Sequence, residues 1–330
     1  MRHSGSLHLN RRTVNNLVLL VLLILLVIFF SSMNPRFFSV RNFVNVVRQI
    51  LPVVLMGCAM TFVINSGAID LSVGGLMALC AVSFATFVTW GVGVWVALLM
   101  VVVIGLIVGA VNTFIVAGLK VPAIMATMAT WLICSGLAYI LCSSIPVRDT
   151  RMKPIFELNS TLFFNKTVPL ALFIILVVVG IFYFLEKRTI LGKYAISIGG
   201  NENAALLSGI NVPRMRLIFY FLTGAMAALA GVWQVSRIGS GDPNIGVAME
   251  FTVIAGCILG GVSIKGGDGT ITGMLLGTVI LALLTNGMNM MGVNAFYQQV
   301  AIGVVLLMAV LITFTVPYLR NKSRSATART

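Results

Sequence analysis

Charged residues are scarce in this chain. Only 9% of its 330 residues are charged, and Asp and Glu together number eight, whereas soluble domains carry about 25% charged residues. Hydrophobic residues make up 59% of the sequence, more than a soluble core can bury. A helix needs about 20 mainly apolar residues to cross a bilayer, and the apolar runs suffice for about ten crossings. We therefore predict an all-α integral membrane protein.

Groups that could catalyse a reaction or hold a metal ion are also few. The two histidines, His3 and His8, lie in the basic N-terminal tail, and no His, Cys or carboxylate cluster has the spacing of metal ligands. No nucleophile pairs convincingly with a base. The chain has no Walker A sequence, and the Gly-rich turn from Gly260 to Gly269 lacks the Gly-Lys-Ser/Thr ending of a phosphate loop. We predict a protein that is not an enzyme and needs no metal or cofactor, so any ATP must be hydrolysed by a partner.

The five cysteines lie inside or at the ends of apolar runs. This placement predicts small buried residues rather than metal ligands. Small residues also recur at helical spacing in Gly105-xxx-Gly109 and Gly273-xxx-Gly277. In a bilayer such pairs let helix backbones approach closely, so we expect tight helix contacts at both places.

Positive charge lies between the apolar runs. The net charge is +14, but the 22 Lys and Arg do not follow one soluble face, so they indicate membrane orientation and not a nucleic-acid partner. The expected spans are 14–32, 50–66, 71–90, 94–118, 121–142, 168–186, 214–236, 250–264, 270–291 and 296–317. An even number puts both termini on one side, and fourteen basic residues on that side against eight on the other predict cytoplasmic termini.

This topology gives one transmembrane domain, residues 14–317, between basic cytoplasmic tails at 1–13 and 318–330. Two segments outside the spans have features that predict a local structure or a contact. Ser39 can cap a short amphipathic helix before residue 50, which we expect to lie in the outer interface. The segment 143–167 is the longest outer stretch, and we predict a loop there that contacts another molecule.

A weak internal repeat appears at an offset of 174 residues. Ser66-Gly67 aligns with Ser240-Gly241, Asn112 with Asn286, and Gly118 with Gly292. In the predicted topology the two halves run in opposite directions across the membrane. Inverted repeats are common in transporters, which place the pathway between them. Three short matches in a Gly-rich chain are also compatible with chance.

Polar residues interrupt two apolar runs at Asn65-Ser66-Gly67-Ala68-Ile69-Asp70-Leu71-Ser72-Val73-Gly74-Gly75. A carboxylate near the membrane costs several kcal/mol unless it is paired or hydrated. The glycines permit a broken helix whose freed backbone groups line a cavity. Asp70 either caps the next helix, accepting bonds from the backbone N–H groups of Ser72 and Val73, or contacts a solute or its gate. Both roles are compatible.

The inner segment 187–213 contains a short capped helix. Asn201 is a good N-cap, Glu202 suits the positive end of the helix dipole, and Gly209 is a good terminator. We predict a helix of about two turns that presents Ala and Leu side chains to a partner; the alternative is a solvated linker. The predicted docking residues are Asn201, Glu202, Ala204, Ala205, Leu206, Ser208 and Gly209.

Four motifs of the chain resemble the ribose-type permeases of bacterial ABC importers. These motifs are Asp70-Leu71-Ser72-Val73-Gly74, Val121-Pro122-Ala123-Ile124-Met125-Ala126-Thr127, the Gly-Gly-Asn-Glu-Asn-Ala-Ala-Leu-Leu-Ser-Gly-Ile-Asn-Val run ending at Val212, and the Leu-Gly-Gly-Val-Ser turn from Leu259. The resemblance extends from about residue 35 to 315. It implies a permease subunit in the bacterial inner membrane, paired with a second permease, driven by a cytoplasmic ATPase subunit and supplied by a periplasmic sugar-binding protein.

The resemblance and the polar residues together predict where solute and receptor would bind. The receptor would dock on Arg148, Arg151 and Lys153 of the outer segment, with phospholipid or solvent contact as the alternative. The amides of Asn286 and Asn289 share one helix face and could bind sugar hydroxyls, or they could join neighbouring helices. The predicted pathway residues are Asn65, Asp70, Ser72, Asn112, Thr127, Asn286 and Asn289. The alternative functions are a branched-chain amino-acid ABC permease and an ion-coupled secondary carrier.

Overall fold

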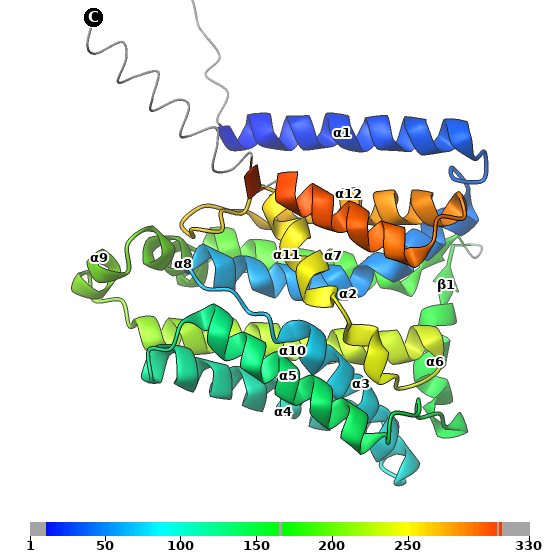
Figure 1. Cartoon of the computed structure of the whole chain (residues 1–330), viewed down its shortest axis with the longest axis horizontal. Helices are drawn as coiled ribbons and strands as arrows, with labels where there is room; N and C mark the ends of the chain where they lie inside the picture. Colours follow the sequence, from blue (N-terminus) through cyan, green and yellow to red (C-terminus); the bar gives the residue numbers. More distant parts are fainter. Residues whose placement is uncertain (1–10, 165–166, 309, 312–330) are drawn as a thin grey trace, which may run out of the picture.

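The computed structural model describes residues 11–164, 167–308 and 310–311 and is almost entirely helical. The expected tail 318–330 and residues 1–10 of the expected N-terminal tail lie outside the described residues. The long helices lie roughly side by side, with α1 (Arg11–Met33) at one edge against α12 (Ile271–Met290) and α4 (Val94–Thr113) with α5 (Ala123–Leu141) at the opposite edge (Figure 1).

The other α-helices are α2 (Val40–Asn65), α3 (Val73–Thr89), α6 (Lys153–Ser160), α7 (Leu170–Arg188), α8 (Ile190–Gly200), α9 (Glu202–Leu207), α10 (Val212–Ile238) and α11 (Met249–Leu259). A last apolar helix runs over Ala295–Met308. Three short helices are the π-helix η1 (Phe114–Gly118) and the 3-10 helices η2 (Thr150–Met152) and η3 (Pro243–Gly246), and the strands β1 (Leu162–Phe163) and β2 (Val168–Pro169) form one antiparallel pair.

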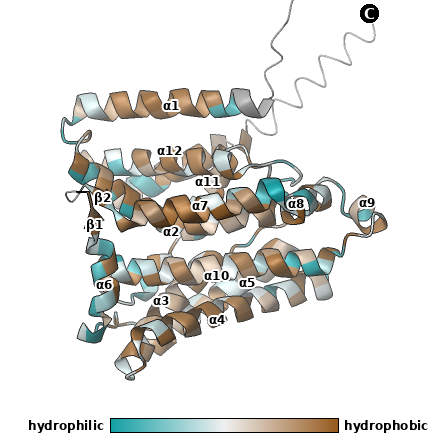
Figure 2. Cartoon of the chain, turned by 180° about the vertical axis from the view of Figure 1, so that it is seen from behind, coloured by the Kyte–Doolittle hydropathy of each residue, from teal (hydrophilic) through white to brown (hydrophobic). Residues whose placement is uncertain are grey.

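Seven described helices are long and apolar enough to cross a membrane, and three shorter apolar helices accompany them: Val73–Thr89, Pro243–Leu259 and Ala295–Met308. Apolar residues predominate along the helices, while polar residues gather at α6 and around α8, at opposite ends of the bundle (Figure 2). The prediction of an all-α membrane protein is therefore confirmed. Each of the ten predicted spans overlaps one of these helices, seven of which are as long as a membrane span.

The first part of α2 differs from the prediction. Ser39 caps the helix as expected, accepting a bond from the backbone N–H of Asn42 at 3.2 Å. However, the helix does not stop before residue 50. It continues through Pro52 to Asn65, so no separate interfacial helix exists there. Most of its apolar stretch is buried among neighbouring helices, and this packing explains why α2 stays continuous through a proline.

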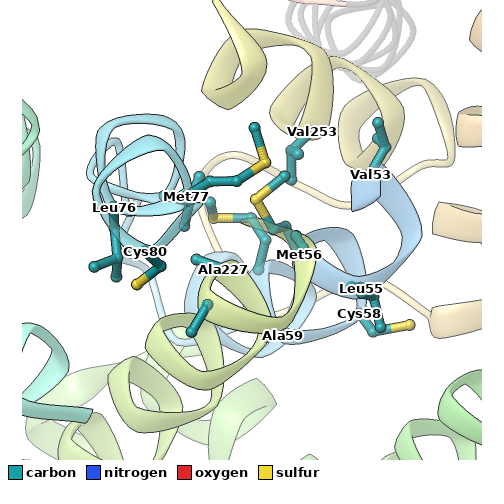
Figure 3. Packing of buried hydrophobic residues seen from close by; sticks show 14 of the residues in the cluster. Val53, Leu55, Met56, Cys58, Ala59, Leu76, Met77, Cys80, Ala227 and Val253 are labelled. Carbon is teal, nitrogen blue, oxygen red and sulfur yellow. The ribbon is translucent and has the colours of Figure 1, made fainter. Parts of the chain in front are cut away.

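The core lies where α2, α3, α10 and α11 meet. Figure 3 shows Met56 of α2 and Met77 of α3 packing together beside Ala227 of α10 and Val253 of α11. Gly105 of α4 and Gly224 of α10 approach so closely that a Cβ at either residue would fall against the other's carbonyl oxygen. This confirms the close contact predicted at Gly105, and Gly273 and Gly277 likewise meet the backbone of residues 256–260.

The segment 143–167, which we expected to be a loop on the outer side, is more structured than predicted. It contains η2, α6 and β1. Helix α6 packs against α10, and the backbone N–H of Asn159 donates a hydrogen bond to Ser236 Oγ at 3.1 Å. Helix α6 was not predicted because it is only eight residues long and depends on this tertiary contact.

Candidate functional site

Asp70 is a buried carboxylate in the connection between α2 and α3, with only 2% of its surface exposed. Its Oδ1 accepts hydrogen bonds from the backbone N–H of Ser72 at 3.0 Å and from the Ser72 hydroxyl at 2.5 Å. Its Oδ2 accepts a bond from Thr223 Oγ1 of α10 at 2.7 Å. Of the two predicted cap bonds, the one from the backbone N–H of Ser72 forms, but the one from Val73 is not found in the described chain, and Ser72 and not Asp70 occupies the N-cap position of α3. Asp70 therefore joins a loop to a distant helix and is not exposed to solute in this conformation.

The network continues across two more helices. Asn112 of α4 donates from Nδ2 to Ser72 Oγ at 2.9 Å, and its Oδ1 accepts a bond from Thr130 Oγ1 of α5 at 2.7 Å. We call Asp70, Ser72, Asn112, Thr130 and Thr223 the buried polar network. All five are buried. A fully satisfied network of this kind specifies one arrangement of the elements it joins, here α3, α4, α5 and α10.

Thr127 supports the same connection from α5. Its hydroxyl accepts a bond from the backbone N–H of Leu71 at 3.0 Å. Four of the predicted pathway residues, Asp70, Ser72, Asn112 and Thr127, are thus brought together. Thr223 could not be found from the sequence, because a single hydroxyl in an apolar helix carries no local signal. Thr130 was not predicted either, although it lies three residues after Thr127 and therefore on the same helix face.

Asn65 links the end of α2 to two other segments. Its carbonyl oxygen accepts a bond from the backbone N–H of Gly267 at 2.9 Å, and its Nδ2 donates to the carbonyl of Gly269 at 3.3 Å. At Gly199, near the end of α8, a Cβ would fall against the Asn65 carbonyl oxygen and 2.6 Å from the Gly267 nitrogen. The end of α8, the 263–269 turn and the start of the Asp70 connection are therefore in backbone contact.

Helix α9 follows directly after this contact. Asn201 accepts a bond from the backbone N–H of Ala204 at 2.9 Å, and Gly209 ends the helix with a φ of 82°. Glu202 forms an ion pair with Arg216 of α10 at 2.6 Å. Leu207 is 91% exposed, the most exposed large hydrophobic residue of the described chain. The predicted caps are confirmed, and the short helix presents an unpaired apolar side chain.

Ala205 does not face outward with its neighbours. It is 4% exposed and packs within this chain. The sequence places Ala205 among the residues that meet a partner, but the structure puts its side chain underneath α9. Leu206 and Leu207 are the exposed apolar residues instead. Helix α9 is short, and its contacts with α8 and α10 determine which of its sides faces inward. These contacts cannot be read from the sequence.

Glu250 is a second buried carboxylate, and the sequence analysis did not single it out. It lies in the first turn of α11 and is 3% exposed. Its Oε2 has no hydrogen-bond partner within the described part of the chain. A Cβ at Gly74 of α3 would collide with this oxygen, so the glycine leaves room for the carboxylate. An intramembrane carboxylate is a sequence signal for a functional site, and it was available at Glu250.

The two amides of α12 do not join the other pathway residues. Asn286 exchanges two hydrogen bonds with Asn42 of α2, at 2.9 and 3.0 Å. Asn289 accepts a bond from Gln298 Nε2 at 2.7 Å. Asn42 and Asn65 lie near opposite ends of α2, about 35 Å apart at 1.5 Å per residue. The predicted pathway between the Asn65 segment and Asn286 therefore does not form a single site in this conformation, and the amides join helices.

The three basic residues expected to meet a receptor differ in their surroundings. Arg151 forms an ion pair with Asp149 at 2.7 Å and donates to the carbonyl of Thr89 at 2.8 Å. Its hydrogen bonds hold the pKa of the Asp149 carboxyl below its usual value. Lys153 is paired with Glu157 at 3.9 Å, whereas Arg148 is exposed. Arg151 thus holds the segment 143–167 to α3. Of the three residues, Arg148 alone has no ion pair within the described part of the chain.

Residues that could bind a metal ion do not cluster in the described ranges, where no group of three His, Cys, Asp or Glu has suitable geometry. The five cysteines are all buried and free, as predicted. The arrangement instead offers hydrogen-bonding groups at helix junctions and an exposed apolar side chain, Leu207, on α9.

Comparison with known proteins agrees with this geometry. A family model described as "Branched-chain amino acid transport system / permease component" matches residues 42–312. The ribose import permease protein RbsC of Escherichia coli (strain K12) is 38% identical over 86% of this chain and 88% of its own length. The protein of the same name from Bacillus subtilis (strain 168) is 37% identical over 86% of this chain and 87% of its own length.

The L-arabinose transport system permease protein AraH of Escherichia coli (strain K12) is 35% identical over 78% of this chain and 77% of its own length. No solved structure matches the chain. Because the family model covers residues 42–312 and these relatives align over most of both sequences, the chain belongs to this family of transport-system permease components.

Proposed function

We propose that this chain is the membrane-spanning permease subunit of an ATP-binding-cassette importer that carries a small sugar or sugar-like solute into the bacterial cytoplasm. A separate cytoplasmic ATPase hydrolyses ATP, a periplasmic binding protein delivers the solute, and a second permease subunit completes the pathway. The observation that carries this proposal is the exposed, capped α9 directly beside the Gly199 contact with the Asp70 connection. The named ribose and arabinose permeases among its relatives favour a sugar.

In the proposed topology ten helices cross the inner membrane and both termini are cytoplasmic. The seven long helices and the three shorter apolar ones supply these crossings. The order then puts α8, α9 and the 263–269 turn in the cytoplasm, and α6 with the β1–β2 pair outside. Basic residues in the last turn of α7, Lys187 and Arg188, agree with a cytoplasmic end there.

Helix contacts support the inverted repeat at an offset of 174 residues. With this offset, α2, α3 and α4 correspond to α10, α11 and α12. The helix contacts are the same when the two halves are exchanged. Helix α4 packs on α10, and its counterpart α12 packs on α2. Likewise, α3 packs on α10, and its counterpart α11 packs on α2. Because corresponding helices run in opposite directions in the proposed topology, the pathway would lie near the interface of the two halves.

The coupling step would run through backbone contacts. Movement of the ATPase would displace α9, which a single residue, Asn201, separates from the end of α8. Gly199 transmits this displacement to Asn65 and to the 263–269 turn, since both touch it directly. The Asp70 connection then follows, and with it the helices joined by the buried polar network. Rigid contact of this kind transmits small movements without a flexible link.

Glu250 is the best candidate for solute contact in the pathway. Its unpaired oxygen lies between α11 and α3, which belong to the two proposed repeats. A rearrangement that separates these helices would expose a carboxylate to which sugar hydroxyls can donate. Glu250→Gln retains the size but removes the charge, and it should lower solute uptake while leaving ATPase docking intact. The control is Glu157→Gln on the exposed α6. Normal uptake by the Glu250 variant would remove it from the pathway.

Reconstitution in liposomes tests the function itself. Uptake of ribose or arabinose should require added ATPase and binding protein together with ATP. Gradient-driven uptake by this chain alone would instead establish the secondary carrier. The same assay with leucine, isoleucine and valine tests the other alternative, a branched-chain amino-acid permease, because the description of the family model names these substrates. Uptake of these amino acids alone would refute the sugar assignment.

A further inference from the structure

An apolar crevice lies beside the connection between α1 and α2. Its volume is about 500 Å³, within the range of about 300–1,000 Å³ typical of ligand pockets. Its walls come from α1, the first turns of α2, the β2 region and α12. The lining residues are Val27, Phe37, Phe38, Ser39, Val40, Asn42, Phe43, Val46, Thr167, Val168 and Leu283.

The polar groups of these walls are already hydrogen-bonded within the chain. Ser39 Oγ donates to the carbonyl of Arg36 at 2.6 Å, and the Asn42 amide donates to the Phe37 carbonyl and to Asn286, at 2.9 Å each. Thr167 Oγ1 donates to the carbonyl of Phe164 at 2.5 Å. A bound water needs two to four polar partners, and a sugar needs partners for its hydroxyls. The crevice therefore selects an apolar occupant.

Two arginines, Arg36 and Arg41, belong to the segment that forms one wall of the crevice, although neither of them lines it. Arg36 directly precedes Phe37, and Arg41 lies between Val40 and Asn42. Both side chains are exposed, and no ion pair engages either of them within the described part of the chain. A guanidinium binds phosphate with paired, charge-assisted hydrogen bonds. Two cations without a carboxylate partner also attract a headgroup with net negative charge more strongly than a zwitterionic one.

We propose that this crevice binds one anionic glycerophospholipid, with an acyl chain in the apolar cavity and its phosphate held by Arg36 and Arg41. The bilayer supplies such molecules next to α1, which packs chiefly against α12. The lipid would fill the space between α1 and α2 and keep α1 attached to the bundle. A second copy of this chain is the competing occupant of the same face.

Native mass spectrometry of the full chain in mild detergent, with added phosphatidylglycerol or phosphatidylcholine, tests the proposal. Wild type should retain one phosphatidylglycerol per chain in preference to phosphatidylcholine. The double substitution of Arg36→Gln and Arg41→Gln should lower the retention of phosphatidylglycerol about tenfold, because it removes charge-assisted hydrogen bonds. A tenfold loss corresponds to about 1.4 kcal/mol. Leu283→Trp should reduce retention of both lipids, because the larger ring fills the cavity.

Two control variants match these changes. Arg148→Gln removes an exposed positive charge from the outer segment, and Leu25→Trp adds a ring on an exposed part of α1 that does not line the crevice. Both should retain lipid as the wild type does. Both lipids carry a phosphate and differ in the net charge of the headgroup, so equal retention by the wild type would overturn the binding of an anionic lipid. Unchanged lipid retention in Leu283→Trp would overturn the crevice as a lipid site. The same holds if Leu283→Trp abolishes a dimer of the chain while the amount of bound lipid stays constant, because a second copy would then be the occupant.

Discussion

Thr223 donates a hydrogen bond to Asp70 across 2.7 Å, and the two residues are 153 positions apart in the sequence. The bond joins α10 to the connection between α2 and α3. Since Ser72 satisfies the other oxygen of Asp70, the carboxylate is held from both sides. Through Asn112 and Thr130 the same network reaches α4 and α5. One carboxylate therefore links α10 to α3, α4 and α5, which are far from it in the sequence.

Removal of the Thr223 hydroxyl should destabilise the protein. Thr223→Val keeps the shape of the side chain but leaves a buried oxygen of Asp70 without its partner, at a cost of about 1–3 kcal/mol. We expect a lower thermal unfolding temperature in detergent. The matched control is Thr285→Val, since the Thr285 hydroxyl bonds only within its own helix; its effect should stay within about 0.5 kcal/mol. Equal losses for both variants would contradict the role of the network.

A methyl group at Gly199 should disturb coupling, whereas the same change one residue later should not. Gly199→Ala places a Cβ against the Asn65 carbonyl and Gly267, but Gly200 has open space around its Cβ position. Solute-stimulated ATP hydrolysis by the assembled complex should fall several-fold for Gly199→Ala and remain normal for Gly200→Ala. If both variants stimulate the ATPase like wild type, the backbone contact does not carry the coupling movement.

Leu207 should dominate the contact between α9 and the ATPase. Full burial of a leucine side chain is worth about 1.5–3 kcal/mol, so Leu207→Asp should weaken ATPase binding roughly ten- to a hundredfold. The permease itself should unfold at the wild-type temperature, because Leu207 is 91% exposed. Asn203→Asp, also exposed, adds the same charge without removing apolar surface and is the control. Wild-type affinity of the Leu207 variant would locate the contact elsewhere.

The effect of Ala205 should differ from that of Leu207. Ala205→Glu forces a carboxylate into a position that is 4% exposed within this chain, so it should lower the stability of the isolated permease by several kcal/mol. The measurement is thermal unfolding without the ATPase. An unchanged unfolding temperature would mean that Ala205 faces the partner, as the sequence analysis expected.

A double-mutant cycle can separate the structural and transport roles of Asn286. The reciprocal bonds with Asn42 predict a coupling energy near 0.6 kcal/mol, with about 1.7 kcal/mol as an upper value for bonds between membrane helices. Asn42→Leu and Asn286→Leu should therefore be non-additive in unfolding free energy. Uptake per folded complex should be normal in both. Additive losses together with reduced uptake would restore Asn286 to the pathway.

Local chemistry determined much of this protein. The scarcity of charge and the length of the apolar runs identified the membrane helices, because each run must satisfy its backbone groups within the bilayer. Ser39, Asn201 and Gly209 marked helix ends, since capping depends on one side chain and its nearest backbone neighbours. The resemblance carried by four short motifs pointed to the permease family before any geometry was known.

Other features were decided only by tertiary structure. The burial of Ala205 beneath α9 depends on α8 and α10, and the partner of Asp70 comes from a helix 153 residues away. Asn286 could bind solute or another helix with the same amide, and only the approach of Asn42 distinguishes them. Glu250 lies in an apolar segment, and its free oxygen becomes visible only once α3 and α11 are packed. A hydrogen-bonding group has the same chemistry in either role, so its role follows from which groups the fold brings within reach.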